Sequence, residues 1–297
     1  MKVITTSNVD ITVPKSSTAF AYKTAPELPA AHMVSLAIGK RGSGKTVAIT
    51  NLVKHLKYDI IYVISPTFKS NSLLMTDLEI PDENVWEDPD DPNVVSDIIQ
   101  RVEEERDILE QYLEDMKEYK MFLKMLKNKN TMVSDEMLFK FFPEGELEPP
   151  KHMYGGRNPF IGLLIDDCQS SKLFSNKRIQ NLTIKHRHIG AFSNNRPSIG
   201  LSMFFLVQNY KSKSGGLDRA IRNNATNALI FKSKDEKELE FIASEMSGEV
   251  SKDKFMQAYK YAVNDGDHPF LFIDLHKKKN HPSMFRSRFN KFLLVDE

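Results

Sequence analysis

Short apolar runs separated by amphipathic stretches recur along most of this chain of 297 residues. Runs of about four to eight apolar residues predict buried strands, and apolar residues that recur every three or four positions predict helices. The expected strands cover 33–38, 59–65, 161–165, 201–207, 225–231 and 269–275. The expected helices cover 44–56, 179–188, 234–246 and 252–263. Strands that alternate with helices predict an α/β domain, with a mostly parallel sheet and helices on both faces.

The segment between the second and third expected strands has a different pattern. From 95 to about 126, apolar residues recur with a seven-residue step along two rows, with charged residues between them. One row holds Val95, Val102, Leu109, Met116 and Leu123, and the other holds Ile98, Tyr112, Tyr119 and Leu126, with Glu105 as its one break. This spacing predicts one long amphipathic helix, and residues 132–142 are expected to return as a second. An arm that projects from the domain and a helix packed on its own domain both fit such a stripe.

These patterns predict a simple domain organisation. We expect an N-terminal extension over 1–32 and one domain over 33–297, which contains a helical insertion at about 82–155. The hydrophobic residues, 40% of the chain, are enough for a buried core. No apolar run approaches the roughly 20 residues of a membrane helix, and the N-terminus lacks the apolar core of a secretory signal. We therefore expect a protein that is neither secreted nor membrane-spanning.

The single cysteine limits the covalent and metal chemistry of this chain, and the charge is distributed unevenly along it. Cys168 is the only cysteine, so an intrachain disulfide is excluded, and a metal ion is expected to have oxygen ligands. Residues 82–148 hold 20 acidic and eight basic residues, whereas residues 169–297 hold 13 acidic and 22 basic residues. Solvated surfaces on a nearly neutral protein account for this asymmetry as well as a charged partner does.

One loop carries a phosphate-binding motif. Gly39, Gly44, Lys45 and Thr46 match G-x-x-x-x-G-K-[ST] between an expected strand and an expected helix. Backbone N–H groups of such a loop surround phosphates at the helix N-terminus, the lysine reaches the β- and γ-phosphates, and the hydroxyl binds Mg²⁺. The sequence therefore predicts an ATP and Mg²⁺ site. The expected loop consists of Gly39, Lys40, Arg41, Gly42, Ser43, Gly44, Lys45 and Thr46.

Two later strands end in residues suited to the same chemistry. Asp166 and Asp167 follow an apolar strand, where Asp166 is expected to bind Mg²⁺ through water and Asp167 to orient and activate the attacking water. A helix-capping role for Asp167 is the alternative. Gln208 follows the next strand, and its amide can both donate to and accept from a γ-phosphate and its water.

The order of these motifs resembles the genome-packaging ATPases of nucleocytoplasmic large DNA viruses, the poxvirus-type packaging ATPases of the HerA/FtsK superfamily. The resemblance spans most of 33–231 and rests on five stretches: GKRGSGKT (39–46), LLIDDCQ (163–169), KHRH (185–188), FFLVQN (204–209) and RAIRNNATNALIF (219–231). It implies a RecA-like core of the additional-strand P-loop NTPase class, in which Lys45, Thr46, Asp166, Asp167 and Gln208 take the roles given above. It also implies a ring oligomer, double-stranded DNA as partner, and a viral assembly site in the host cytoplasm or the virion. Capsid or portal proteins are further candidate partners.

The resemblance also draws attention to arginines. Arg187 and His188 resemble the family's arginine-histidine element, and Arg222 resembles a further arginine, with Arg219 nearby. We expect one of them to reach a neighbouring subunit's nucleotide, because a guanidinium spreads its charge over several phosphate oxygens. The simpler alternatives are that Arg187 pairs with an acid and that Arg222 caps its helix. The long link 190–200, which contains Arg196, is expected to be a flexible loop.

Three functions remain open at this point. The first is an ATP-driven translocase that packages double-stranded viral DNA into a preformed capsid. The second is a nucleotide-dependent switch or assembly ATPase that acts on capsid or membrane partners without moving DNA. The third, a nucleotide kinase or small-molecule phosphotransferase, is the weakest, because no acceptor-binding lid is evident and Gln208 suits hydrolysis.

Overall fold

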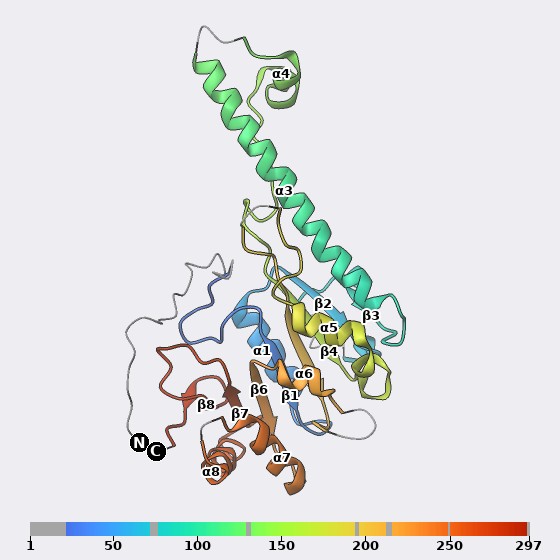
Figure 1. Cartoon of the computed structure of the whole chain (residues 1–297), viewed down its shortest axis with the longest axis vertical. Helices are drawn as coiled ribbons and strands as arrows, with labels where there is room; N and C mark the ends of the chain where they lie inside the picture. The colour runs from blue at the N-terminus through green and yellow to red at the C-terminus, as the bar shows by residue number, and fades with distance from the viewer. Residues whose placement is uncertain are drawn as a thin grey trace, which may run out of the picture.

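The computed structural model describes residues 22–71, 77–128, 132–193, 196–211, 216–248 and 250–295, so residues 1–21 of the expected extension lie outside it. Within these residues the core is a nine-stranded sheet in the order β3-β2-β4-β5-β1-β6-β7-β8-β9 (Figure 1). The strands are β1 Val34–Ile38, β2 Ile60–Ile64, β3 Val85–Trp86, β4 Ile161–Asp166, β5 Ser202–Val207, β6 Asn227–Phe231, β7 Phe270–Asp274, β8 Phe285–Ser287 and β9 Lys291–Phe292.

The sheet is mostly parallel, as predicted. Strands β3, β2, β4, β5, β1 and β6 pair in parallel, whereas β7, β8 and β9 are antiparallel. Strand β5 lies between β1, which leads into the phosphate loop, and β4, which ends in Asp166. This inserted strand confirms the additional-strand P-loop NTPase fold. Strands β3, β8 and β9 were not predicted, because strands of two or three residues give no periodic signal.

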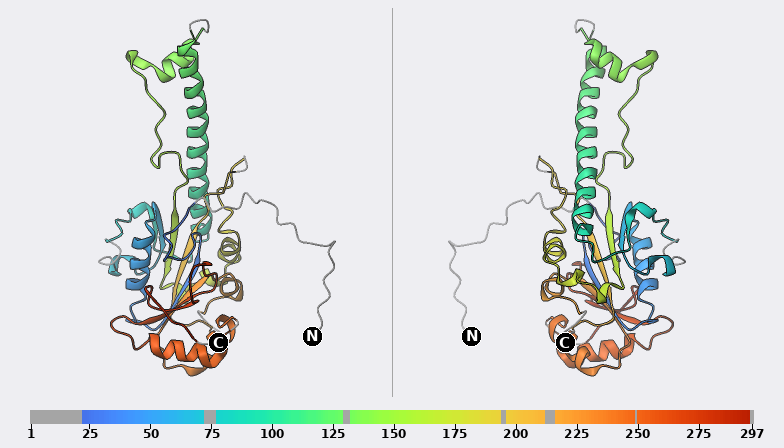
Figure 2. Two further views of the ribbon diagram at one scale, coloured as in Figure 1. Left: turned by 90° about the vertical axis from the view of Figure 1, so that its left-hand side faces the viewer. Right: turned by 90° about the vertical axis from the view of Figure 1, so that its right-hand side faces the viewer.

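Helices cover both faces of the sheet (Figure 2). The helices are α1 Lys45–Leu56, α3 Val94–Lys127, α4 Asp135–Phe141, α5 Lys177–Lys185, α6 Arg219–Asn223, α7 Glu236–Met246 and α8 Lys252–Ala262. Helix α1 packs on one face, and the base of α3 with α5, α6, α7 and α8 packs on the other. Successive strand residues serve opposite faces, so Leu36 contacts the larger core cluster and Ala37 the smaller one. Short 3-10 turns cover Phe68–Asn71, Asp82–Asn84, Pro143–Gly145, Cys168–Ser170 and Leu173–Ser175.

Helix α3 both packs on the domain and projects from it. Its first half buries Val95, Ile98, Val102 and Leu109 in the larger core cluster. A helix of 34 residues is about 51 Å long at about 1.5 Å per residue, and its second half extends away from the sheet (Figure 1). The two interpretations left open by the sequence therefore each hold for one half of the helix.

The tip of this arm has a small core of its own. Helix α4 folds back so that Phe141 packs on Phe122, and both side chains are buried. Lys140 of α4 forms ion pairs with Asp115 and Glu118 of α3, at 2.8 and 2.7 Å. The neighbouring Phe139 is 82% exposed. The expected return helix is thus confirmed, and it presents an aromatic side chain to solvent.

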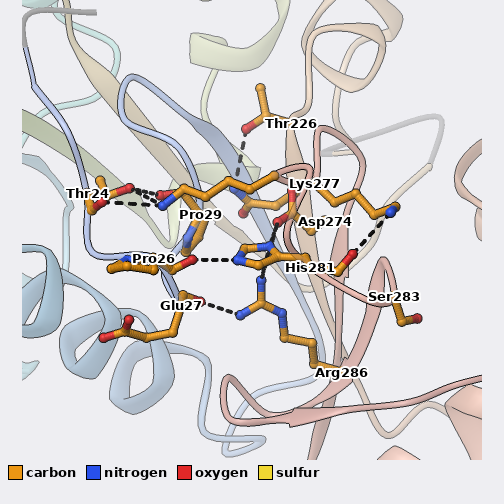
Figure 3. A network of polar contacts seen from close by, with 12 residues as sticks. Thr24, Pro26, Glu27, Pro29, Thr226, Asp274, Lys277, His281, Ser283 and Arg286 are labelled. Carbon is orange, nitrogen blue, oxygen red and sulfur yellow. Dashed lines mark hydrogen bonds and ion pairs between the residues drawn. The ribbon is translucent and has the colours of Figure 1, made fainter.

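A buried polar network holds the segment before β1 against the antiparallel strands (Figure 3). Arg286 of β8 donates hydrogen bonds to the Glu27 carbonyl at 2.6 Å, to His281 Nδ1 at 2.9 Å and to Asp274 at 3.4 Å. His281 Nδ1 accepts from arginine, so its proton lies on Nε2, which donates to the Pro26 carbonyl at 2.7 Å. Residues of the expected extension that the structure describes are therefore packed onto the domain.

Candidate nucleotide-binding site

The phosphate loop follows β1 and turns into α1 at Gly44. Gly44 has φ 93°, in the left-handed region that glycine adopts without a steric penalty. Gly39 is required for a different reason, since a Cβ there would lie 2.7 Å from the Phe231 Cβ atom of β6. The loop is therefore shaped by the close approach of β6 as well as by its own turn.

Lys45, the first residue of α1, points back along the loop. Its Nζ donates to the carbonyl oxygens of Gly39 and Lys40, at 2.8 and 3.2 Å. Burial lowers the pKa of Lys45, and the charges of Asp166 and Asp167 partly oppose that effect. The ammonium group is thus held inside the loop, beside two carboxylates.

The two phosphate motifs meet at a single hydrogen bond. Thr46 Oγ1 donates to Asp166 Oδ2 at 3.1 Å, across 120 positions of sequence. Asp166 is only 3% exposed, and its pKa is raised to about 6 by burial and then by the charge of Asp167. The structure brings together the hydroxyl and the carboxylate that the sequence analysis assigned to Mg²⁺.

Thr46 and Asp166 fit a magnesium ion on chemical grounds. Mg²⁺ prefers hard oxygen ligands, and proteins usually supply one or two of them beside water and substrate phosphates. The hydroxyl and carboxylate are such ligands, and they line the same cavity. A cation there would also offset the unfavourable burial of the Asp166 charge, which its raised pKa reflects.

Asp167 adopts a left-handed backbone conformation, with φ 53°, at the carboxyl end of β4. Its Oδ2 atom accepts a hydrogen bond from Thr67 Oγ1 at 3.0 Å. Within the described chain, this side chain makes no capping hydrogen bond to the 3-10 turn Cys168–Ser170 that follows. The carboxylate is therefore positioned by the loop after β2, a contact that the sequence analysis did not foresee.

These residues surround one cavity of about 370 Å³, within the range of about 300 to 1,000 Å³ that small-molecule sites occupy. It is lined by Arg41, Gly42, Ser43, Gly44, Lys45, Thr46, Val47, Thr67, Ser70, Asp166, Asp167 and His268. Most of the expected phosphate loop and both aspartates are thus gathered at one site. Gly39 and Lys40 instead contribute the carbonyl oxygens that hold Lys45.

Gln208 and the predicted arginines Arg187 and Arg222 do not line this cavity. Gln208 directly follows β5, at the edge where the parallel strands end. Its neighbour Asn209 lines a second cavity of about 760 Å³ at this edge, together with Arg219 and Arg222. Among the described residues, the linings of these two cavities do not include Gln208 itself.

The arginines are not brought to the phosphate loop of their own chain. Arg187 lines a cavity of about 200 Å³ with His32, which precedes β1, so it lies at the opposite edge of the sheet. The Arg222 side chain is only 8% exposed and pairs with Glu245 at 3.1 Å. Its guanidinium carbon also lies 5.3 Å from the Tyr210 ring centroid. In the part of the chain that the structure describes, the lining of the phosphate-loop cavity includes neither Arg187 nor Arg222.

The long link 190–200 is tied down at its ends. Ile199 N–H donates to the Gly190 carbonyl, and Arg196 donates to Asn158 and to the Gly156 carbonyl, at 3.0 and 2.9 Å. Residues 194 and 195 lie outside the described residues. The guanidinium of Arg196 is thus held by its own chain.

Sequence reasoning missed Thr67 and His268 as site residues. Thr67 follows an expected strand, so the rule that found Asp166 could also have found Thr67. His268 could not be found in this way, because it precedes its strand. It reaches the site because β7 is antiparallel to β6.

Comparisons with known proteins gave structural likenesses only: no family model and no curated protein matches the chain. The chain is similar to the genome packaging NTPase B204 from Sulfolobus turreted icosahedral virus 2 in complex with ATP-gammaS. That match has 15% identity and a TM-score of 0.41, and covers 82% of this chain and 92% of the other. The chain is also similar to the pCW3 conjugation coupling protein TcpA, at 17% identity and a TM-score of 0.35, over 84% of this chain and 58% of the other.

Proposed function

We propose that this protein hydrolyses ATP to translocate double-stranded DNA, and that it packages a viral genome into a preformed capsid. The observation that carries the ATPase part is the hydrogen bond between Thr46 and Asp166, which joins the phosphate loop to the acidic strand end. The DNA and packaging part is supported by the motif order, from the phosphate loop to Gln208, that resembles packaging ATPases.

In this proposal each group has a defined task. The loop N–H groups and Lys45 bind the phosphates and balance charge that develops on the transferred phosphoryl group. Thr46 and Asp166 would hold Mg²⁺, which neutralises phosphate charge when it is bound. Asp167, oriented by Thr67, accepts a proton from the attacking water, and Gln208 orients that water and the γ-phosphate.

A neighbouring subunit in a ring would supply the remaining cation. Arg187 lies at the opposite edge of the sheet from its own phosphate loop, so in this proposal it would act on the nucleotide of another chain. Arg222 would first have to leave Glu245, whereas the nearby Arg219 is exposed. Mixing Lys45→Ala protein with Arg187→Ala or Arg222→Ala protein should restore part of the turnover if that arginine acts between subunits. Co-assembled mixtures with only the summed activity of the two variants would argue against it.

The projecting arm favours a second candidate, a nucleotide-dependent assembly ATPase that does not move DNA. Phe139 of α4 and Met132, shortly before α4, are 82% and 94% exposed, and α4 lies at the end of the arm away from the sheet (Figure 1). Large apolar side chains that are exposed together mark protein docking surfaces, and Met121, Leu126 and Phe142 of the same arm are exposed as well. In this alternative, ATP turnover would respond to a protein partner and not to duplex DNA.

The test is ATP turnover with Mg²⁺, measured with and without duplex DNA. We expect Lys45→Ala and Asp166→Ala to reduce turnover to background, because each removes charge stabilisation at the reacting phosphate. Lys54→Ala is the matched control, since Lys54 is an exposed lysine in the last turn of the same helix. Stimulation of the parent protein by duplex DNA supports the translocase. Turnover that is unaffected by DNA supports the assembly ATPase instead.

A further inference from the structure

His268 reaches the phosphate loop because of the direction of one strand. Strand β7 runs antiparallel to β6, and Phe270 at its start pairs with Phe231 at the end of β6. The residues just before β7 therefore lie at the edge of the sheet where β1 ends and the phosphate loop begins. An all-parallel sheet would have placed the same residues at the opposite edge.

The contact between His268 and the loop is close. A Cβ atom added at Gly44 would lie 3.0 Å from His268 Nδ1, and 3.5 Å from both its Cβ and Cγ atoms. His268 itself has φ 48°, a conformation uncommon outside glycine, and it is exposed on the cavity wall. The imidazole ring thus lies directly over the last glycine of the loop.

The cavity has two chemically different ends. Asp166 and Asp167 come from β4 and Thr67 follows β2, and both strands lie on one side of β1 in the sheet. His268 precedes β7, which lies on the other side of β1. A triphosphate whose last phosphate faces the aspartates must extend its nucleoside in the other direction, toward His268.

We propose that His268 stacks on the nucleoside of the bound nucleotide and so makes the site prefer nucleotides over bare polyphosphate. The inference rests on the proposed ATP hydrolysis, since it concerns the same cavity. A flat aromatic ring on an open cavity wall offers the base a stacking surface, in addition to the contacts that the loop makes with phosphates. Among the described residues that line the cavity, His268 is the only aromatic one.

The test compares binding of ATP and of inorganic tripolyphosphate by titration calorimetry with Mg²⁺. We expect His268→Ala to weaken ATP binding roughly tenfold, the effect of losing one base-stacking contact, and to leave tripolyphosphate binding within about twofold. His268→Phe should retain ATP binding, because it keeps the ring and removes the polar nitrogens. His55→Ala is the matched control, since His55 is exposed in the last turn of α1.

Three results would overturn the inference. Equal losses for ATP and tripolyphosphate in His268→Ala would assign the imidazole to a phosphate contact. Full ATP affinity in His268→Ala would show that His268 does not contact the nucleotide. Mg²⁺-dependent ATP turnover by the parent protein would in that case still support the proposed function. A parent protein that binds neither ligand, with Lys45→Ala behaving identically, would refute the proposed function and this inference together.

Discussion

The Asp166 carboxylate should support ATP turnover but destabilise the folded protein when no nucleotide or Mg²⁺ is bound. The variant Asp166→Asn tests this directly. The pKa of Asp166 is raised from 3.8 to about 6, mainly by burial. Between these two pH values the native state binds more protons than the unfolded chain, so stability falls as pH rises through this window. Each pKa unit corresponds to about 1.4 kcal/mol. A pKa raised by about two units therefore lowers the free energy of unfolding by about 3 kcal/mol at pH values above 6.

Asparagine keeps the shape of the side chain and its acceptor for Thr46, but has no charge to bury. Asp166→Asn should therefore be more stable than the parent by up to about 3 kcal/mol. For a chain of this length that corresponds to roughly 5 °C in melting temperature. The same variant should lack Mg²⁺-dependent ATP turnover, because the carboxylate ligand is lost.

The assay is thermal unfolding of parent and variant, without nucleotide and with a chelator, at several pH values from about 4 to 8. The difference between them should be largest above pH 6 and should shrink as pH falls toward 4. Asp265→Asn is the control with the opposite sign, because hydrogen bonds from Ser287 and Lys291 lower the pKa of Asp265. An Asp166→Asn protein that is no more stable than the parent at pH 7.5 would refute the reasoning.

Two further predictions concern the second aspartate and the arm. Thr67→Val removes the hydrogen bond to Asp167 and should lower kcat by about tenfold with little change in KM. Thr67→Ser keeps the hydroxyl and should restore kcat. An unchanged kcat in Thr67→Val would show that Asp167 needs no such orientation. Replacing 114–149 by a short Gly/Ser linker should leave ATP binding intact and weaken assembly or partner docking. A short linker can join the two ends, because the ring centroids of Tyr112 and His152 lie 5.0 Å apart. Loss of the folded core, seen by circular dichroism and thermal unfolding, would show that the tip supports the domain.

Local pattern was sufficient wherever the deciding interactions are close in sequence. The phosphate loop was predictable because glycines, lysine and threonine must follow one another for a loop to surround phosphates. Helix α3 was predicted to within one residue at each end, since its apolar stripe has the helical period. Asp166 lines the same cavity as the phosphate loop because parallel strands end at a common edge of the sheet.

The rest was decided by contacts between distant segments. Whether the stripe of α3 packs or projects depends on how far the domain reaches beneath it, which no local pattern encodes. The sequence made Arg187 and Arg222 equal candidates for an arginine that acts between subunits. In the structure, Arg187 lies at the opposite edge of the sheet and Arg222 pairs with Glu245. His268 enters the cavity because β7 pairs antiparallel with β6. Strand direction is set by tertiary packing, because an apolar run of five residues reads the same in either direction.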